Sequence, residues 1–253
     1  MIPDLDTVAA IIREAAETEV LPRFRHLAAA QIREKKPGQI VTEADVEAER
    51  VLARRLTELF PAAVVGEESV DADPTLLRAL EHPGPVWVID PVDGTANFAQ
   101  GHARFAMIIA LVVDGRTVAG WIHDPVPDRT VMAALGQGAW LGETRLSVLT
   151  EVPLAEMNGS VKRKGPVAAR VATVGRKGSA AHDYLDLVTG QLHFAHFNRL
   201  MPWDHAAGVL IHAEAGGWAC LTDGRPYRPV AESGSLLLAP GPASWRELSL
   251  LVE

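Results

Sequence analysis

Cysteine is nearly absent from this chain, since Cys220 is the single cysteine among 253 residues. One thiol cannot form an intramolecular disulfide, so a hydrophobic core has to stabilise the fold, and an apolar fraction of 48% is ample for one. This composition suits a reducing compartment, and we expect a cytoplasmic protein. Cys220 lies in the apolar segment 218–221, which favours a buried small side chain over a reactive thiol.

The chain also lacks an excess of positive charge. Its net charge is -8, and an acidic surface repels phosphate backbones, so we expect no nucleic-acid partner. Long hydrophobic runs are missing as well: the longest, 105–113, has about half of the ~20 residues that span a bilayer. The charged residues Asp4, Asp6, Arg13 and Glu14 interrupt the apolar stretch that a signal peptide needs. We therefore expect a soluble protein without a membrane partner.

The N-terminal part alternates helical and strand patterns. Apolar residues at helical spacing over 4–34 predict a helix that Pro22 kinks or splits. Pro37-Gly38 predicts a turn, and Thr42 is a good N-cap for a second helix that ends near Phe60. Strand-like runs follow at 63–65, 86–89, 105–113, 118–123 and 130–134. Asp114-Gly115 is a hairpin signal between two of them.

The C-terminal part is also mixed. We predict a strand at 171–174, helices ending near 188 and covering 203–215, strands at 218–221 and 236–238, and a last helix from 243. The sequence has no internal repeat and no low-complexity linker. These patterns predict one mixed α/β (α+β) domain over 1–253, with an N-terminal portion of about 1–145 and a C-terminal portion of about 146–253.

Acidic residues follow two of the predicted strands, where open sheets usually place ligand sites. Strand 63–65 leads into Gly66-Glu67-Glu68-Ser69, and strand 86–89 leads into Asp90-Pro91-Val92-Asp93-Gly94-Thr95. The second segment delivers two carboxylates at i and i+3 across a stiff proline bend, and Val92 can offer its carbonyl inward. Gly94 allows backbone to approach a ligand, and Thr95 can open a short helix. Such hard oxygen ligands suit Mg²⁺ or Mn²⁺ rather than zinc.

The segment Asp90 to Phe98, with the sequence DPVDGTANF, resembles the signature of the inositol monophosphatase family. Further motifs of that family occur in the same order along this chain. They are Val41-Thr42-Glu43-Ala44-Asp45, Gly66-Glu67-Glu68-Ser69, Gly178-Ser179-Ala180, and Trp203-Asp204 followed by Glu214-Ala215-Gly216-Gly217. The resemblance runs from about residue 36 to 240. It implies a layered α-β-α-β-α sandwich of the inositol monophosphatase and fructose-1,6-bisphosphatase type, often a homodimer, with lithium-sensitive activity that depends on Mg²⁺.

The resemblance also assigns roles to residues of this chain. The metal ligands would be Glu67, Asp90, the Val92 carbonyl, Asp93 and Asp204. Glu67, Thr95 and Asp45 would be catalytic, with Glu67 orienting the attacking water and the other two handling its proton. The substrate-binding residues would be Asp93, Gly94, Thr95, Gly178, Ser179, Ala180, Arg199 and Asp204, with Lys36 and Arg176 as further candidates. Lys35 is an equal candidate for the position of Lys36.

Two or three Mg²⁺ ions, or Mn²⁺ in their place, would explain how an acidic protein binds an anionic phosphate ester, because cations convert an acidic pocket into an anion site. Other polar residues have ordinary interpretations. Glu68 is a neighbour rather than a ligand, Asp71 and Asp73 lie in a solvated loop, His205 and His212 are helix-face histidines, and Lys162-Arg163-Lys164 is a solvated loop.

The substrate stays open at this point. Inositol phosphatases of the family carry an acidic residue about seven positions before the late Trp-Asp aspartate, where this chain reads His196-Phe197-Asn198-Arg199. The first hypothesis is a polyol or sugar phosphate similar to inositol 1-phosphate. The second is histidinol phosphate, fructose 1,6-bisphosphate or a nucleotide 3',5'-bisphosphate, whose second anion Arg176, Lys177 and Arg199 could bind. A third is a regulatory protein of the same fold that contacts the transcription machinery.

Overall fold

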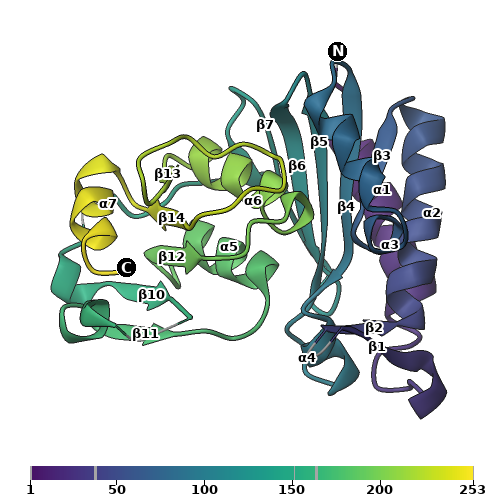
Figure 1. The fold of residues 1–253 in the computed structure, drawn as a ribbon, viewed down its shortest axis with the longest axis horizontal. Coiled ribbons are helices and arrows are strands. Elements are labelled where there is room, and N and C mark those ends of the chain that lie inside the picture. Colours follow the sequence, from purple (N-terminus) through teal and green to yellow (C-terminus); the bar gives the residue numbers. More distant parts are fainter. Residues whose placement is uncertain (1, 37–38, 151, 163–164, 253) are drawn as a thin grey trace.

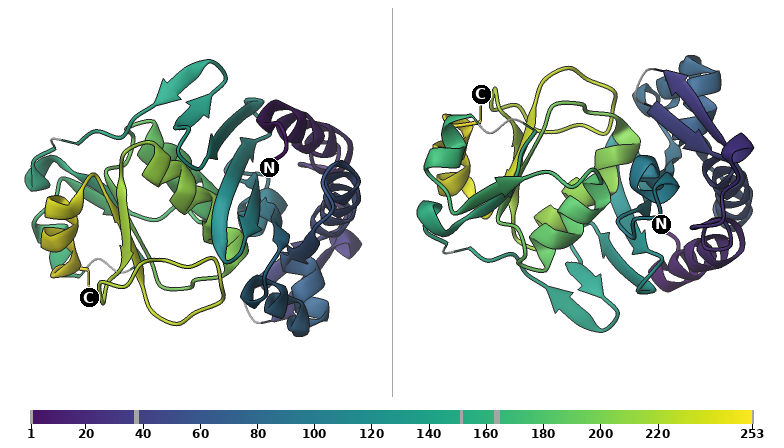
Figure 2. Two further views of the ribbon diagram at one scale, coloured as in Figure 1. Left: turned by 90° about the horizontal axis from the view of Figure 1, so that it is seen from above. Right: turned by 90° about the horizontal axis from the view of Figure 1, so that it is seen from below.

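The computed structural model describes residues 2–36, 39–150, 152–162 and 165–252. Five layers follow one another across the molecule (Figure 1): α1 and α2, a seven-stranded sheet, α5 and α6, a five-stranded sheet, and α7. Figure 2 shows the same succession from above and below. The α-β-α-β-α sandwich expected from the sequence is therefore confirmed.

The seven-stranded sheet has the order β3-β4-β5-β6-β7-β8-β9, and all neighbouring pairs except the parallel pair β3–β4 are antiparallel. Its strands are β3 (Ala63–Gly66), β4 (Pro85–Asp93), β5 (Ala106–Val113), β6 (Arg116–Asp124), β7 (Arg129–Ala134), β8 (Ala139–Leu141) and β9 (Thr144–Leu146). Asp114 and Gly115 both have positive φ in the β5–β6 turn, which confirms the predicted hairpin. The parallel pair β3–β4 places Glu67 and Asp90 at the same edge of the sheet.

One face of this sheet is covered by α1 (Leu5–Ala15), a π-helical turn at Ala16–Val20 and α2 (Glu43–Leu59). Alternate residues of β4 explain the packing, since Trp87 and Ile89 join Ile12 and Leu52 in this core. A hairpin of β1 (Ile32–Lys36) and β2 (Gln39–Thr42) lies at the end of this layer, followed in the chain by α2. Between β3 and β4 lie α3 (Glu67–Ala72) and the 3-10 helix Pro74–Glu81.

The opposite face of the sheet packs against α5 (Ala180–Val188) and α6 (Pro202–Glu214). A second hydrophobic core lies here, formed by this face, the two helices and the smaller sheet. Val86 and Val88 of β4 point into this core, one residue out of phase with Trp87. Gly120 of β6 lies so close to Ala207 that a Cβ on the glycine would be 2.8 Å from the Cα of Ala207. The first turn of α6 is thereby held against the sheet next to the end of β4.

The smaller sheet has the order β11-β10-β12-β14-β13. Its strands are β10 (Asn158–Ser160), β11 (Thr173–Gly175), β12 (Phe194–Phe197), β13 (Trp218–Leu221) and β14 (Leu236–Ala239). The last helix, α7 (Pro242–Ser249), covers its outer face through Leu248, which packs with Phe194 and Leu237. The remaining short 3-10 helices are Ala29–Gln31, Leu154–Glu156 and Pro166–Ala169.

The long helix predicted over 4–34 is wrong beyond Val20. The π-helical turn ends at Val20, a turn carries Pro22, and Ile32–Lys36 forms a strand instead. The strand exists because Arg33 and Glu34 pair with Val41 and Ile40 across the hairpin, a contact that local helical spacing does not reveal. The turn predicted at Pro37-Gly38 lies outside the described residues, as do Arg163 and Lys164 of the predicted basic loop. Within the described residues, the structure has no helix long and apolar enough to span a bilayer.

Candidate active site

Three carboxylates from two elements meet beside the large sheet. Asp90 and Asp93 end β4, and Asp204 lies in the first turn of α6. One carboxylate oxygen of each lies within 4.8 Å of the others. Because Val86 and Val88 face α6, Asp90 continues the same face and points toward the start of that helix. The cluster predicted from two distant motifs is therefore brought together in space.

These carboxylates lie in an environment that disfavours their charge. Asp90 is 1% and Asp93 is 9% exposed, while Asp204 opens partly into a cavity. Burial raises the pKa of Asp90 and of Asp204 well above the usual range, and the neighbouring carboxylates raise each pKa further. Burial also raises the pKa of Asp93, although hydrogen bonds to it act in the opposite direction. Such a cluster needs positive charge to be stable in its ionised form.

Glu67 is the first residue of α3 and lines the same cavity of about 330 Å³. Burial raises its pKa to about 6, even though the ammonium of Lys35 opposes that rise. Lys35 Nζ lies 3.7 Å from Glu67 Oε1 and 2.5 Å from Glu68 Oε1. Glu68 is thus a partly buried partner of Lys35, and burial raises the pKa of Glu68 to about 7. The geometry places Lys35 at the site, whereas Lys36 is turned outward to Asp71 at 3.1 Å.

A residue that the sequence did not single out holds the turn carrying Glu67. Glu49 of α2 is 3% exposed, and its carboxylate accepts the backbone N–H groups of Glu68 at 2.8 Å and Ser69 at 2.9 Å, together with the Ser69 hydroxyl. Gly66 is required beside it, because a Cβ on Gly66 would overlap the Glu49 carboxylate. Within an amphipathic helix pattern, Glu49 gives no signal that distinguishes it from a solvated glutamate.

Asp45 and Thr95 form a pair next to the cluster, as the resemblance implied. Asp45 Oδ2 accepts from the backbone N–H of Thr42 at 2.8 Å and from its hydroxyl at 2.6 Å. The Thr95 hydroxyl lies 3.1 Å from Asp45 Oδ1 and 3.0 Å from the carbonyl oxygen of Val92. Asp45 is 1% exposed, and burial raises its pKa despite these donors. The Val92 side chain is buried in the core, so its carbonyl is on the side of the site.

Gly94 and α4 (Thr95–Ala99) close the site from one side. Gly94 has φ +88, and a Cβ at this position would lie 2.8 Å from the carbonyl oxygen of Arg104. Asn97 Nδ2 lies 2.8 Å from that same oxygen and 3.0 Å from the carbonyl oxygen of Lys177. Asn97 therefore ties α4 to the loop before α5.

That loop carries the predicted turn Gly178-Ser179-Ala180. Gly178 and Ala180 line the cavity, while Ser179 is the N-cap of α5 and is 3% exposed. The Ser179 hydroxyl donates to Asp93 Oδ2 at 2.5 Å, and the backbone N–H of Ala181 donates to the same oxygen at 2.8 Å. The structure thus gives Ser179 a contact with Asp93 in addition to its place beside the cavity.

The cavity is also lined by Arg176, Phe197, Asn198 and Arg199. Phe197 is 3% exposed and its ring is stacked on Tyr184, so it forms a wall and not a polar contact. His205 also lines the cavity: Nε2 donates to the Arg199 carbonyl at 2.8 Å, and Nδ1 accepts from the Tyr184 hydroxyl at 3.0 Å. Burial lowers the pKa of His205 to about 4, so it is a neutral support for the Arg199 segment. Gln39, Ile40 and Ala96 complete the lining and were not predicted.

The donor set fits hard divalent cations. Several carboxylate oxygens converge within one cavity, and burial raises the pKa values of their carboxyl groups. Oxygen-only sites of this kind suit Mg²⁺ or Mn²⁺. The residues that would hold the ions are those expected from the sequence: Glu67, Asp90, Val92, Asp93 and Asp204.

The chain is similar in sequence and in structure to proteins of one family. A sequence model described as the inositol monophosphatase family matches residues 4–252. An inositol-1-monophosphatase of Mycobacterium leprae is 36% identical over 223 residues, covering 81% of this chain and 76% of that protein. One of Bacillus subtilis is 33% identical over 157 residues, which span 57% of this chain and 59% of that relative's length. Relatives named Nus factor SuhB match as well.

Among solved structures, the IMPase of Thermotoga maritima has a TM-score of 0.83 at 28% identity, covering 97% of this chain and 95% of that one. The fold and the carboxylate cluster define a metal-dependent phosphatase. The chain belongs to the inositol monophosphatase family, a family of phosphoric monoester hydrolases. The membership that the sequence motifs indicated is confirmed.

Proposed function

We propose that this protein hydrolyses a small phosphate monoester, such as a polyol or sugar phosphate, with Mg²⁺ held by Glu67, Asp90, the Val92 carbonyl, Asp93 and Asp204. The observation that carries the proposal is the convergence of the Asp90, Asp93 and Asp204 oxygens within 4.8 Å of one another. These residues lie in a cavity that also presents two arginines, and a phosphate ester needs both metal ligands and anion-binding groups.

When bound, the ions supply charge neutralisation of the phosphoryl oxygens and a nucleophilic water at neutral pH. The chain contributes position and proton transfer. Glu67 sits at the cavity wall where it can orient the attacking water, and Lys35 fixes its carboxylate from behind. Gly94 and Thr95 line the cavity, and their backbone N–H groups would bind the phosphate oxygens.

Asp45 and Thr95 are the proposed proton path. The Thr95 hydroxyl can accept the water's proton while it passes its own to Asp45 Oδ1, 3.1 Å away. Asp45 is suited to this role because burial raises its pKa toward the range in which a carboxylate can accept a proton. The three Thr42 and Thr95 contacts keep the carboxylate in one orientation during the transfer.

The cavity residues that would contact the leaving group favour another candidate substrate, one that carries a second anionic group. Arg176 and Arg199 both line the cavity, and Phe197 stands where family inositol phosphatases carry an acidic residue. Two guanidinium groups bind phosphate or carboxylate through charge-assisted hydrogen bonds, whereas neutral ring hydroxyls gain less from them. Bisphosphates and phosphorylated acids are thus candidates beside neutral polyol phosphates.

The test is phosphate release from a panel of monoesters and bisphosphates, measured with Mg²⁺ and with EDTA. We expect turnover that requires the metal and is inhibited by lithium. An absence of phosphate release from the entire panel, with correctly folded protein and saturating Mg²⁺, would disprove the proposed activity. Light scattering of the same sample tests the expected homodimer. A stoichiometric partner from the transcription machinery without any turnover would favour the regulatory alternative instead.

We predict that Arg199→Met lowers kcat/KM for a bisphosphate by about 10-fold and for a neutral polyol monophosphate by less than about threefold. The guanidinium would bind the second anion equally in the ground and transition states, so the loss is expected in KM. Arg116→Met is the matched control, because Arg116 is an exposed arginine at the start of β6. Equal losses on both substrates would show that Arg199 does not select for a second anion.

A further inference from the structure

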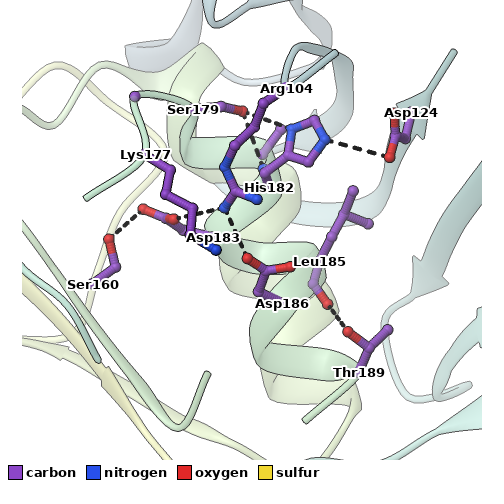
Figure 3. A network of polar contacts seen from close by, with 12 residues as sticks. Arg104, Asp124, Ser160, Lys177, Ser179, His182, Asp183, Leu185, Asp186 and Thr189 are labelled. Carbon is purple, nitrogen blue, oxygen red and sulfur yellow. Dashed lines mark hydrogen bonds and ion pairs between the residues drawn. The ribbon is translucent and has the colours of Figure 1, made fainter. Parts of the chain in front are cut away.

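A line of polar side chains leads from Asp93 through the molecule to the far end of β6. Ser179 Oγ lies 2.5 Å from Asp93 Oδ2 and 3.0 Å from His182 Nδ1. His182 Nε2 lies 3.3 Å from Asp124 Oδ2, and Figure 3 shows His182 between Ser179 and Asp124. Arg129 at the start of β7 closes the line, with Nε at 3.1 Å and Nη2 at 2.9 Å from the same Asp124 oxygen.

The middle of this line is inaccessible to solvent. Ser179 is 3%, His182 is 4% and Asp124 is 2% exposed. Buried polar groups without partners destabilise the folded state, so the geometry of one member constrains the next. The line also joins three parts of the fold, because Asp93 ends β4, His182 lies in the first turn of α5, and Asp124 ends β6.

Counting hydrogens assigns the direction of the bond between Ser179 and Asp93. A serine hydroxyl has one hydrogen, and an ionised carboxylate only accepts, so Ser179 donates to Asp93. Ser179 Oγ accepts from the backbone N–H of His182 at 3.2 Å, and His182 Nδ1 lies 3.0 Å from the same oxygen. Nε2 faces the Asp124 carboxylate, to which Arg129 also donates. The His182 ring therefore connects Ser179 to Asp124.

The same three residue types form nucleophilic triads in hydrolases, but this arrangement does not activate Ser179. In a triad the histidine accepts the serine proton, whereas here the Ser179 hydroxyl donates that proton to Asp93. The effect of the line is on Asp93 instead. Ser179 and the Ala181 N–H both bind Oδ2 and thereby hold the Asp93 carboxylate in one orientation.

We propose that His182 and Asp124 are positioning residues that, through Ser179, fix the orientation of the Asp93 carboxylate and thereby set the affinity of the site for its divalent cation. The inference rests on the proposed metal site. Groups that orient a metal ligand from behind typically change metal affinity by about 10–100-fold when they are removed. Neither His182 nor Asp124 lines the cavity, so they act on the ion only through Asp93.

The experiment is calorimetric titration of the substrate-free protein with Mn²⁺ and Mg²⁺. We expect His182→Leu to weaken binding by about 10-fold or more, because Ser179 loses its contact with the His182 ring and can turn away from Asp93. His182→Asn can still donate to Ser179 and is expected to recover a large part of the affinity. His212→Leu is the matched control: His212 is also a fully buried helix histidine, but it makes no contact with this line.

Thermal unfolding of the metal-free variants separates positioning from stability. A purely structural role would lower Tm in His182→Leu while the dissociation constant for Mn²⁺ of the folded protein stays within twofold of wild type, and that result would overturn the proposal. If His182→Leu does not fold, Asp124→Asn replaces it, with an expected weakening of about threefold, since it keeps the acceptor but removes the charge. Unchanged affinity in Asp124→Asn would equally overturn the proposal.

The two proposals can fail separately. Wild-type protein that binds neither Mn²⁺ nor Mg²⁺ would contradict the proposed function itself. Wild-type protein that binds the ions, together with a His182→Leu variant that binds them equally well, would contradict only the positioning role.

Discussion

Asp90→Asn is expected to lower metal-dependent phosphate release by at least about 10³-fold, which corresponds to roughly 4 kcal/mol of lost transition-state stabilisation. Asp90 is 1% exposed and lies within the carboxylate cluster, so the amide removes one negative ligand without a change in shape. Its Oδ1 can still accept the backbone N–H of Val92, as Asp90 does at 3.1 Å. The measurement is kcat/KM at saturating Mg²⁺, with Asp223→Asn as an exposed control.

The same substitution is expected to stabilise the metal-free protein. Burial and the charges of Glu67, Asp93 and Asp204 raise the pKa of Asp90, so the folded state holds its proton more tightly than the unfolded chain does. The wild type therefore loses stability as pH rises above the pKa that Asp90 has in the unfolded chain. Asparagine does not ionise, so the variant does not have this loss. We expect a gain of about 1–2 kcal/mol at pH 8, or a Tm higher by roughly 2–8 °C.

Two outcomes would contradict this account. A variant that keeps activity would show that Asp90 is not needed to hold the ions. A variant that is less stable than wild type without metal would show that the carboxylate is favourably solvated or paired in the folded protein. Inactivity combined with higher stability is the signature of a residue kept for function at a cost in stability.

The sequence predicted those parts of the site that depend on local signals. Strand β4 begins with a continuous apolar run, Pro91 and Gly94 mark the bend, and Asp90 and Asp93 follow that run, so their convergence could be anticipated. Asp204 was placed by its motif at a helix start, and the structure has it in the first turn of α6. The layered fold came from the family resemblance and not from the periodicity alone.

Other parts depend on contacts between residues far apart in the chain. His182 meets Asp124 only because α5 packs on the large sheet, and nothing local distinguishes either from a surface residue. Glu49 appears in sequence as one of many helix glutamates, yet it holds the turn that carries Glu67. The strand pair β1–β2 is likewise determined by cross-strand pairing, which is why the spacing of apolar residues indicated a helix there.

Acidification is expected to destabilise the protein through His212, a histidine of α6 that is 0% exposed. Neither of its ring nitrogens has a hydrogen-bond partner among the described residues, and Gly217 is required beside it because a Cβ there would overlap the ring. Burial lowers the pKa of His212 from 6.5 to about 4. The folded protein therefore holds this histidine neutral at a pH where the unfolded chain already protonates it.

The sign follows from that difference. Between pH 6.5 and pH 4 the unfolded state binds more protons, so the contribution of His212 to stability is complete above pH 6.5 and is lost as pH falls. From pH 7.5 to pH 5 the loss amounts to about 2 kcal/mol. His212→Leu cannot be protonated, so its free energy of unfolding should fall by about 2 kcal/mol less than that of wild type over this interval. Urea unfolding at the two pH values measures it, with His82→Leu as an exposed control. Parallel pH dependences for His212→Leu and wild type would mean that His212 is accessible to protons in the folded protein, contrary to its burial.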